Sequence, residues 1–343
     1  MNKDKIGVFI VDDSILFRHT IANMLTEEGS IEVVGMANDP IEAIDKIEKL
    51  KPDVITLDVE MPKMSGIEFL KQLLPKHPIP VVMVSSISSS VFDALNAGAV
   101  DFVAKPNNWA KTGVEFFGNE LITKIKIASI VKMAKKSKLV SKPSVFSGHN
   151  NTFNKATEKI IAIGASTGGT EAILGVLCAL PKEMPGIVVV LHMPPTFTKM
   201  YAERLNTVCK MDVKEAEDGE FILPGKVLIA PGGMHMAVAK KGDFPIVRCF
   251  EGEKVNGHCP SVDILFDSVS ETMGKDSVGV LLTGMGRDGA AGLLNMKTKG
   301  AHTIVQDEKT CVVYGMPKEA VKIGAADRIL PLGKIADYII QTL

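Results

Sequence analysis

A serine set among glycines lies near the middle of the chain, in the stretch KIIAIGASTGGTEA at residues 159–172. An apolar, strand-like run leads there into Gly164-Ala-Ser166-Thr-Gly168 and then into a helix-like run. The pentapeptide fits G-x-S-x-G, the pattern of a nucleophilic serine at a sharp strand-to-helix turn. It also fits an ordinary glycine turn whose hydroxyl caps the helix. The motif therefore predicts nucleophilic catalysis only if a base and an orienting acid reach the same turn.

A histidine and an aspartate follow two later strand-like runs. His192 ends GIVVVLH, and Asp288 lies just beyond VGVLLTGMGR. Since parallel strands gather functional groups at their carboxyl ends, we expect both to lie near Ser166. In such a set the serine attacks, the histidine takes its proton and the aspartate orients the imidazole. The adjoining glycine-rich turns offer the backbone N–H groups of Thr167 and Met285 as an oxyanion hole.

Residue types alone leave three alternatives open around this motif. His235 and His258 are rival bases, because each also lies close to a strand end or a turn. A zinc site of His192, His235, His258 and Cys259 has suitable ligands, but it lacks any HExxH or CxxC pair. A phosphate-binding loop is disfavoured, because the turn contains neither GK[ST] nor G-x-G-x-x-G.

The first half of the chain carries a second set of reactive groups at strand ends. Asp12 and Asp13 follow one apolar run, and Asp58 follows another. Three carboxylates at one sheet edge repel each other unless a hard cation such as Mg²⁺ binds them. Ser85 and Lys105 end two further runs and add a hydroxyl and an ammonium group. Together these groups predict a site that accepts a phosphoryl group, with Asp58 as the nucleophile.

The elements that must position both sets alternate between strand and helix. Five β-then-α units in the first half predict a parallel sheet covered on both faces. The second half alternates again, with strands expected at 159–164, 187–192, 226–230, 278–283 and 301–305. The run HMAVAKKGDFPIVRCF, at 235–250, predicts a hairpin inserted into this second domain. The fold class is α/β, with two doubly wound parallel-sheet domains: the first flavodoxin-like and the second Rossmann-like.

Three segments follow from this alternation. Residues 1–125 form the first domain, and residues 126–158 a helical and then flexible linker rich in Ser, Lys, Asn and Thr. Residues 159–343 form the second, larger domain. The two domains share an architecture but no visible sequence repeat.

The composition narrows the functional class. The chain has 343 residues, 46% hydrophobic and 23% charged, with a net charge of −1. This balance gives no general attraction to nucleic acid or to anionic membranes, and no apolar run is long enough to span a bilayer. Five cysteines without a CxxC pair fit reduced thiols. We therefore expect a soluble cytoplasmic protein with no nucleic-acid partner and no membrane insertion.

Residues 4–125 resemble response-regulator receiver domains. The resemblance rests on VDDS, LDVEMPKMSG, MVSS and FVAKP, in this order and spacing. It implies that a histidine kinase phosphorylates Asp58 with the help of Mg²⁺. The implied metal ligands are Asp12, Asp13, Asp58 and the main-chain carbonyl of Glu60, and the implied switch residues are Ser85, Lys105 and Phe102.

Residues 159–343 are similar to the catalytic domains of the chemotaxis protein-glutamate methylesterases, the CheB family. The matching segments are AIGASTGGTEA, VVLHMPPTFT, LIAPGGMHM, HCPSVDILF, GVLLTGMGRDGAAGL and CVVYGMPKEA. The resemblance implies Ser166, His192 and Asp288 as the catalytic triad, with no cofactor for ester hydrolysis. Cys259 departs from the family, in which an arginine often stands at this place.

The two resemblances together imply regulated hydrolysis. The expected substrates are glutamyl methyl esters, and also glutamines, on methyl-accepting chemoreceptors, and the phosphodonor is a chemotaxis histidine kinase. We expect the unphosphorylated receiver to restrain the enzyme and phosphorylation of Asp58 to release it. Two rival functions are a transcription factor and an interaction module with an inactive triad. A transcription factor needs a helix-turn-helix or a basic patch, and residues 159–343 show neither. An inactive interaction module is disfavoured, because all three triad residues are present.

Overall fold

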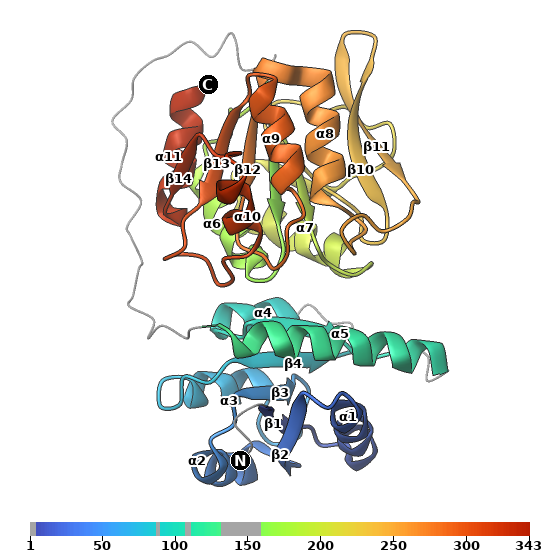
Figure 1. Cartoon of the computed structure of the whole chain (residues 1–343), viewed down its shortest axis with the longest axis vertical. Helices are drawn as coiled ribbons and strands as arrows, with labels where there is room; N and C mark the ends of the chain where they lie inside the picture. Colours follow the sequence, from blue (N-terminus) through green and yellow to red (C-terminus); the bar gives the residue numbers. More distant parts are fainter. Residues whose placement is uncertain (1–4, 87–89, 107–110, 132–158) are drawn as a thin grey trace. The chain divides into compact units, whose positions relative to one another are not determined.

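The computed structural model describes residues 5–86, 90–106, 111–131 and 159–343. The chain divides into two compact units, residues 1–139 and 140–343 (Figure 1). Each unit is an α/β sandwich built on a parallel sheet, which confirms the fold class expected from the alternating pattern.

The first unit contains a five-stranded parallel sheet in the order β2-β1-β3-β4-β5. Its strands are β1 (Ile6–Val11), β2 (Ile31–Ala37), β3 (Val54–Asp58), β4 (Val81–Ser85) and β5 (Asp101–Ala104). The chain reverses its direction of winding between β1 and β3, so the ends of these two strands form the crevice where α/β sheets bind ligands. Asp12, Asp13 and Asp58 lie at these ends.

Five helices cover the two faces of this sheet, namely α1 (Ile15–Glu27), α2 (Pro40–Leu50), α3 (Gly66–Leu73), α4 (Ser90–Ala97) and α5 (Lys111–Ser129). α1 and α5 share one face, where Phe17 and Phe117 pack into the same apolar core. Side-chain caps start three of the helices: Ser14 accepts from Phe17, Asp39 from Glu42, and Ser65 forms a capping box with Glu68.

The last helix continues past the boundary that the sequence suggested. α5 extends to Ser129, and Ala128 is buried in the core with Ile125. The predicted boundary at residue 125 therefore falls within a helix of the first unit. The rest of the predicted linker, from residue 132 to 158, lies outside the described residues.

The second unit is built on a seven-stranded parallel sheet in the order β14-β13-β12-β6-β7-β9-β8. Its strands are β6 (Ile160–Ala165), β7 (Gly186–Leu191), β8 (Asp212–Glu215), β9 (Lys226–Ile229), β12 (Ser277–Leu281), β13 (His302–Gln306) and β14 (Arg328–Leu330). The five strands that the sequence predicted are all present. β8 and β14, which form the two edges, were not predicted.

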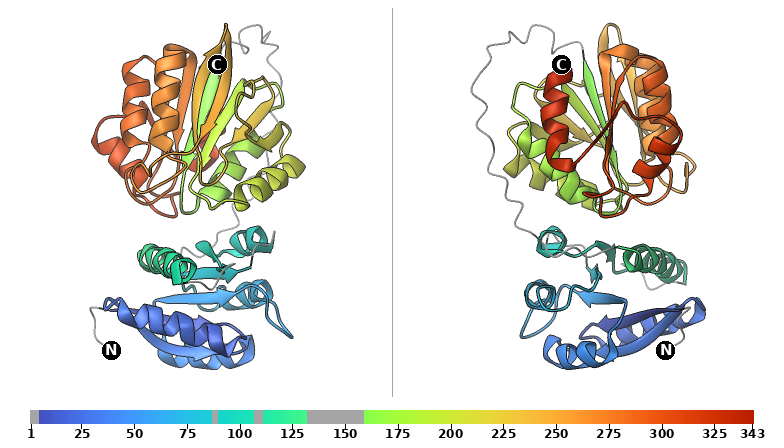
Figure 2. Two further views of the ribbon diagram at one scale, coloured as in Figure 1. Left: turned by 90° about the vertical axis from the view of Figure 1, so that its right-hand side faces the viewer. Right: turned by 60° about the vertical axis from the view of Figure 1, so that its left-hand side comes forward.

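Helices cover both faces of this larger sheet (Figure 2). They are α6 (Gly169–Ala179), α7 (Phe197–Val208), α8 (Val262–Met273), α9 (Ala290–Thr298), α10 (Met316–Lys322) and α11 (Leu332–Thr342), with a short 3₁₀ turn at Gly274–Asp276. α6 packs against α11, and α8 packs against α9. The predicted hairpin is confirmed as β10 (His235–Lys241) and β11 (Phe244–Phe250), paired antiparallel beside α8.

The helices and the cysteines were both the subject of expectations from the composition. Within the described ranges, every helix is too short or too polar to cross a lipid bilayer. The five cysteines are all free thiols, as their spacing predicted.

Candidate functional sites at the ends of the parallel strands

Ser166 and His192 lie at the ends of neighbouring strands of the second unit. Ala165 pairs with Leu191 in the β6–β7 ladder, and the His192 N–H donates to the Ala165 carbonyl oxygen over 3.2 Å. Ser166 follows β6 directly, so the two residues are neighbours across the sheet edge. β6 is also the strand at which the winding reverses, between β7 and β12. The serine therefore occupies the switch point, where doubly wound sheets bind ligands.

Asp288 completes this set from the loop after β12. Its Oδ2 lies 2.8 Å from Nε2 of His192, and the aspartate is only 1% exposed. Four more donors bind the same carboxylate: Asn256 Nδ2, Ser261 Oγ and the N–H groups of Val262 and Asp263. Burial raises the pKa of Asp288, but these hydrogen bonds, led by that of His192, outweigh it and hold the pKa well below its usual range. Asp288 is thus a fixed, ionised anchor for His192.

The remaining nitrogen of His192 is the reactive one in this arrangement. Because Nε2 is bound to Asp288, Nδ1 is the atom left for a proton acceptor role. Nδ1 is buried and has no hydrogen-bond partner within the described part of the chain. A buried acceptor without a hydrogen bond lowers the stability of the folded state, so such an atom calls for a functional explanation.

The turn after β6 holds Ser166 through its backbone. Its N–H donates to the Thr283 carbonyl oxygen, and its carbonyl accepts from Gly169. The N-cap of α6 is Gly168, at φ +76° and without a side-chain cap, so the interpretation of Ser166 as a capping hydroxyl is wrong. Gly284 passes so close that a Cβ there would lie 2.8 Å from the Ser166 Cβ. The positive φ explains Gly168 of the motif, and the close approach explains Gly284 in the facing turn.

The proposed oxyanion donors are placed by the same two turns. Thr167 is buried directly after Ser166, at the amino end of α6. Met285 follows Gly284 and is 42% exposed. The two residues thus lie in the turns after β6 and β12, which approach each other at Ser166.

His235, the chief rival base, is fully occupied elsewhere. It is 1% exposed, its Nε2 donates to the Glu253 carbonyl oxygen over 2.8 Å, and its Nδ1 accepts from the Ser261 N–H over 3.2 Å. With both nitrogens bonded to backbone, it has no free acceptor for Ser166. The alternative of a zinc site is also not supported, because the three aspartates of the first unit are the single potential metal-binding group in the described ranges.

Two supporting residues of this site escaped the sequence analysis. Asn256 donates from Nδ2 to both Asp288 and Asp263, at 3.0 and 2.7 Å, and Ser261 Oγ donates to Asp288 over 2.8 Å. The one local signal is the dipeptide Asn256-Gly257, which favours a tight hairpin turn. Nothing local indicates which carboxylate this turn reaches.

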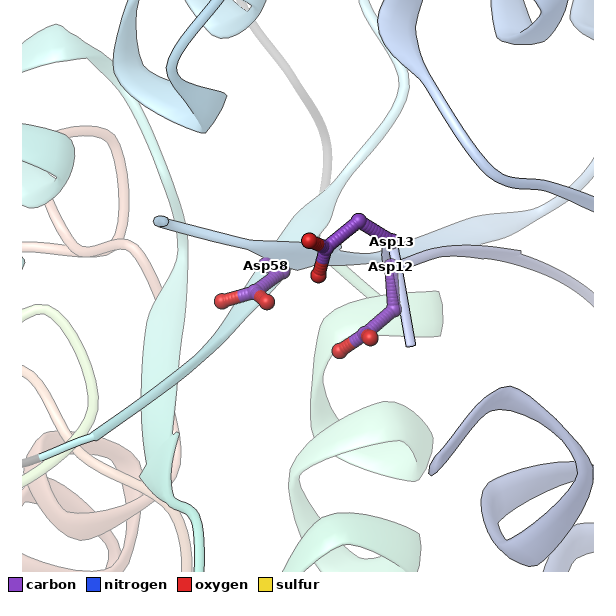
Figure 3. A group of neighbouring side chains, drawn as sticks. All are labelled: Asp12, Asp13 and Asp58. Atoms are coloured by element: carbon purple, nitrogen blue, oxygen red, sulfur yellow. The ribbon is translucent and has the colours of Figure 1, made fainter. Parts of the chain in front are cut away.

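The first unit brings its three aspartates together as expected (Figure 3). One carboxylate oxygen from each of Asp12, Asp13 and Asp58 lies within 4.8 Å of the others. Lys105 Nζ donates to Asp12 over 2.9 Å and to Asp58 over 2.6 Å. One lysine for three carboxylates leaves an excess of negative charge. An oxygen-only donor set with this charge fits Mg²⁺.

Burial and charge act strongly on Asp58. Burial and the nearby charge of Asp12 raise its pKa to about 6, although the hydrogen bond from Lys105 opposes this rise. The pKa of Lys105 is raised as well, because its two carboxylate partners outweigh its own burial. Asp58 is therefore held in a strained electrostatic environment that a further positive charge would relieve.

The remaining receiver positions adjoin this site. Ser85 ends β4, is buried, and donates to the Ser86 carbonyl oxygen. The Glu60 N–H donates to Asp58 over 3.2 Å, which fixes the backbone of the loop after β3. Phe102 is buried on β5, edge-on to Phe92 of α4 at 6.4 Å between ring centroids.

Comparisons with known proteins match both units. Residues 8–112 match the response regulator receiver domain, and residues 161–339 match the CheB methylesterase family. A protein of Syntrophomonas wolfei named protein-glutamate methylesterase/protein-glutamine glutaminase 2 is 51% identical, covering 100% of this chain and 99% of its own. One of Syntrophotalea carbinolica, named protein-glutamate methylesterase/protein-glutamine glutaminase, is 48% identical, covering 99% and 98%. The crystal structure of the Thermotoga maritima CheB methylesterase catalytic domain is 41% identical, with a TM-score of 0.53, and covers 55% of this chain and 100% of its own.

The fold and the two sites define a class of protein: a response regulator whose receiver is followed, in the same chain, by an α/β output unit with a Ser-His-Asp set. Identity with the curated relatives spans both units and nearly the full length of each chain. The protein belongs to the CheB methylesterase family.

Proposed function

We propose that this protein is a protein-glutamate methylesterase and protein-glutamine glutaminase of bacterial chemotaxis, regulated by phosphorylation of its receiver. Its substrates are glutamyl methyl esters and glutamines of methyl-accepting chemoreceptors. The observation that supports this best is the 2.8 Å bond between His192 and Asp288, which leaves the buried Nδ1 of His192 unpaired. His192 neighbours Ser166 across the edge of the sheet. The names of the full-length relatives give the substrate class.

Ester hydrolysis proceeds in two halves at Ser166. Its Oγ attacks the ester carbonyl carbon while its proton passes to Nδ1 of His192. The imidazolium then protonates the methoxy group, methanol leaves, and the glutamyl group remains bound to Ser166. In the second half water gives a proton to Nδ1 and attacks the acyl group. The proton returns to Oγ, and the free glutamate carboxylate is released.

The neighbouring groups lower the barrier to this reaction. The N–H groups of Thr167 and Met285 stabilise the negative oxygen that develops in each tetrahedral intermediate. Asp288 stabilises the imidazolium, since its depressed pKa keeps it ionised. An amide carbon offers the same chemistry with ammonia as the leaving group, so one triad performs both activities.

The receiver accepts its phosphoryl group on Asp58, from a chemotaxis histidine kinase. Asp12, Asp13, Asp58 and the Glu60 carbonyl would hold Mg²⁺. When bound, this ion supplies positive charge that stabilises the transferring phosphoryl group. The Asp58 carboxylate attacks the phosphorus, the P–N bond to the phosphohistidine of the kinase breaks, and the imidazole leaves. Lys105 pairs with the charge on the phosphoryl oxygens.

Rearrangement around the phosphorylated site would carry the signal. Ser85 and Phe102 are the switch residues that respond to the new charge. We place the protein in the cytoplasm, where the signalling helices of receptors and the kinase meet it.

The test is release of methanol from a methyl-esterified chemoreceptor fragment, and of ammonia from a glutamine-bearing one. Ser166→Ala and His192→Gln should each lower both rates by about 10³-fold or more. His302→Gln is the matched control, because His302 is exposed at the start of β13. Loss of methanol release in His302→Gln, or its persistence in Ser166→Ala, would contradict the proposed triad.

A further inference from the structure

A second imidazole lies flat against the proposed catalytic base. The rings of His192 and His258 are stacked, with centroids 3.6 Å apart and an interplanar angle of 8°. The mechanism above assigns no role to His258. The sequence left His258 open as a rival base. In the structure its ring stacks on the face of His192, and it is His192 that is bonded to Asp288.

A tight turn sets the position of His258. The N–H and carbonyl groups of Val255 and His258 bond to each other in both directions, each at 3.0 Å. Asn256 and Gly257 between them have φ values of +53° and +86°. Positive φ at both central residues is the mark of a type I′ hairpin turn. Because Asn256 is bonded to Asp288, the same turn joins His258 to the carboxylate that holds His192.

His258 presents an uncharged ring at neutral pH. Burial, together with the adjacent charge of His192, lowers its pKa to about 4, and Lys254 acts in the same direction. Asp288 opposes this shift but does not overcome it. A neutral ring can lie face-on against an imidazolium without repulsion, which a second imidazolium could not do.

One hydrogen bond does not fix the plane of an imidazole ring. Held by Nε2 alone, His192 could swing about the line to Asp288 Oδ2, and this would change the direction in which Nδ1 points. We propose that His258 is a positioning residue, whose planar ring packs on His192 and holds Nδ1 directed at the nucleophile. The inference rests on the proposed roles of Ser166 and His192.

Two substitutions at His258 distinguish an effect of the planar ring from an effect of side-chain volume. His258→Phe keeps a flat aromatic face and removes the titrating nitrogens, whereas His258→Leu keeps apolar volume without a plane. We expect the Leu variant to lose about 10- to 100-fold in kcat with KM nearly unchanged, as misplacement of a catalytic group does. The Phe variant should recover kcat to within about threefold of wild type.

Methanol release gives kcat and KM, and the reaction of Ser166 with a fluorophosphonate gives a second rate that needs no receptor. Both are normalised to the folded fraction from circular dichroism, and His258→Met repeats the non-planar test if the Leu variant folds poorly. Wild-type kcat in the Leu and Met variants would overturn the inference. So would a Phe variant as inactive as His192→Gln, since His258 would then transfer protons itself. If wild type itself neither releases methanol nor labels at Ser166, the proposed function fails instead.

Discussion

The surroundings of Asp58 disfavour the ionised form of its carboxyl group. It is buried beside Asp12, and one lysine serves both carboxylates. Its pKa is near 6 in the folded chain and near 3.8 when unperturbed. Between these values the folded state holds a proton that the unfolded state has lost. The contribution of Asp58 to stability is therefore highest below about pH 4 and falls as the pH rises through 6.

Asp58→Asn should stabilise the metal-free receiver at pH 7. Removing the ionised carboxylate relieves the repulsion from Asp12, and a shift of this size corresponds to about 3 kcal/mol. The advantage over wild type should shrink toward zero near pH 4, where Asp58 is protonated. Calorimetry of the receiver transition between pH 4 and 7, with a chelator present, measures this.

Asp45→Asn is the matched control for this prediction, because Asp45 lies exposed on α2. It should change the transition temperature little at any pH. A receiver destabilised by Asp58→Asn at pH 7, or a shift that does not depend on pH, would contradict the electrostatic account.

At the scale of elements, the site depends on how closely two turns approach each other. Gly284, after β12, passes against Ser166, after β6. A Cβ at Gly284 would lie 2.8 Å from the Ser166 Cβ and 3.1 Å from its backbone nitrogen. The Ser166 N–H also donates to the Thr283 carbonyl oxygen, so the β12 loop contacts Ser166 through two consecutive residues.

Gly284→Ala should therefore impair catalysis as well as stability. Displacement of Ser166 predicts a loss of about 10²-fold in kcat, and overpacking predicts about 1–3 kcal/mol of destabilisation. Gly175→Ala provides the control: Gly175 is exposed on α6, where an added Cβ meets its nearest atom at 3.9 Å. The control should keep wild-type kcat and gain roughly 0.4–1 kcal/mol. Full activity in Gly284→Ala would show that the contact with Ser166 is not needed.

Periodicity predicted the strands that carry the site, because each buried parallel strand is a nearly continuous apolar run. β8 and β14 were missed since they are short, partly charged edge strands, defined by the neighbour they pair with. For the same reason, the five hydrogen bonds to Asp288 could not be predicted. They come from segments about 25 to 96 positions away along the chain.

Local chemistry favoured His192 over His235 only modestly. Both stand at strand ends, and only the tertiary structure gives His235 two backbone partners. At the level of the sequence, the family resemblance strengthened the choice of His192.

At the scale of the whole molecule, one chain joins a phosphoryl-accepting site to a hydrolytic site. Each site lies at the reversal point of its own parallel sheet, and the residues proposed for it all come from one unit. In the regulation proposed above, a change at Asp58 acts on Ser166 through a change in population between states of the chain.

The most direct test of this account is methanol release by the full-length protein from a methyl-esterified receptor fragment, with and without Mg²⁺ and a small phosphodonor. We predict stimulation of about 5- to 150-fold in wild type and in Asp45→Asn, lost in Asp58→Asn, with no release in Ser166→Ala. The account would be contradicted if a receiver shown to be phosphorylated left the rate unchanged, or if Asp58→Asn still responded to the phosphodonor.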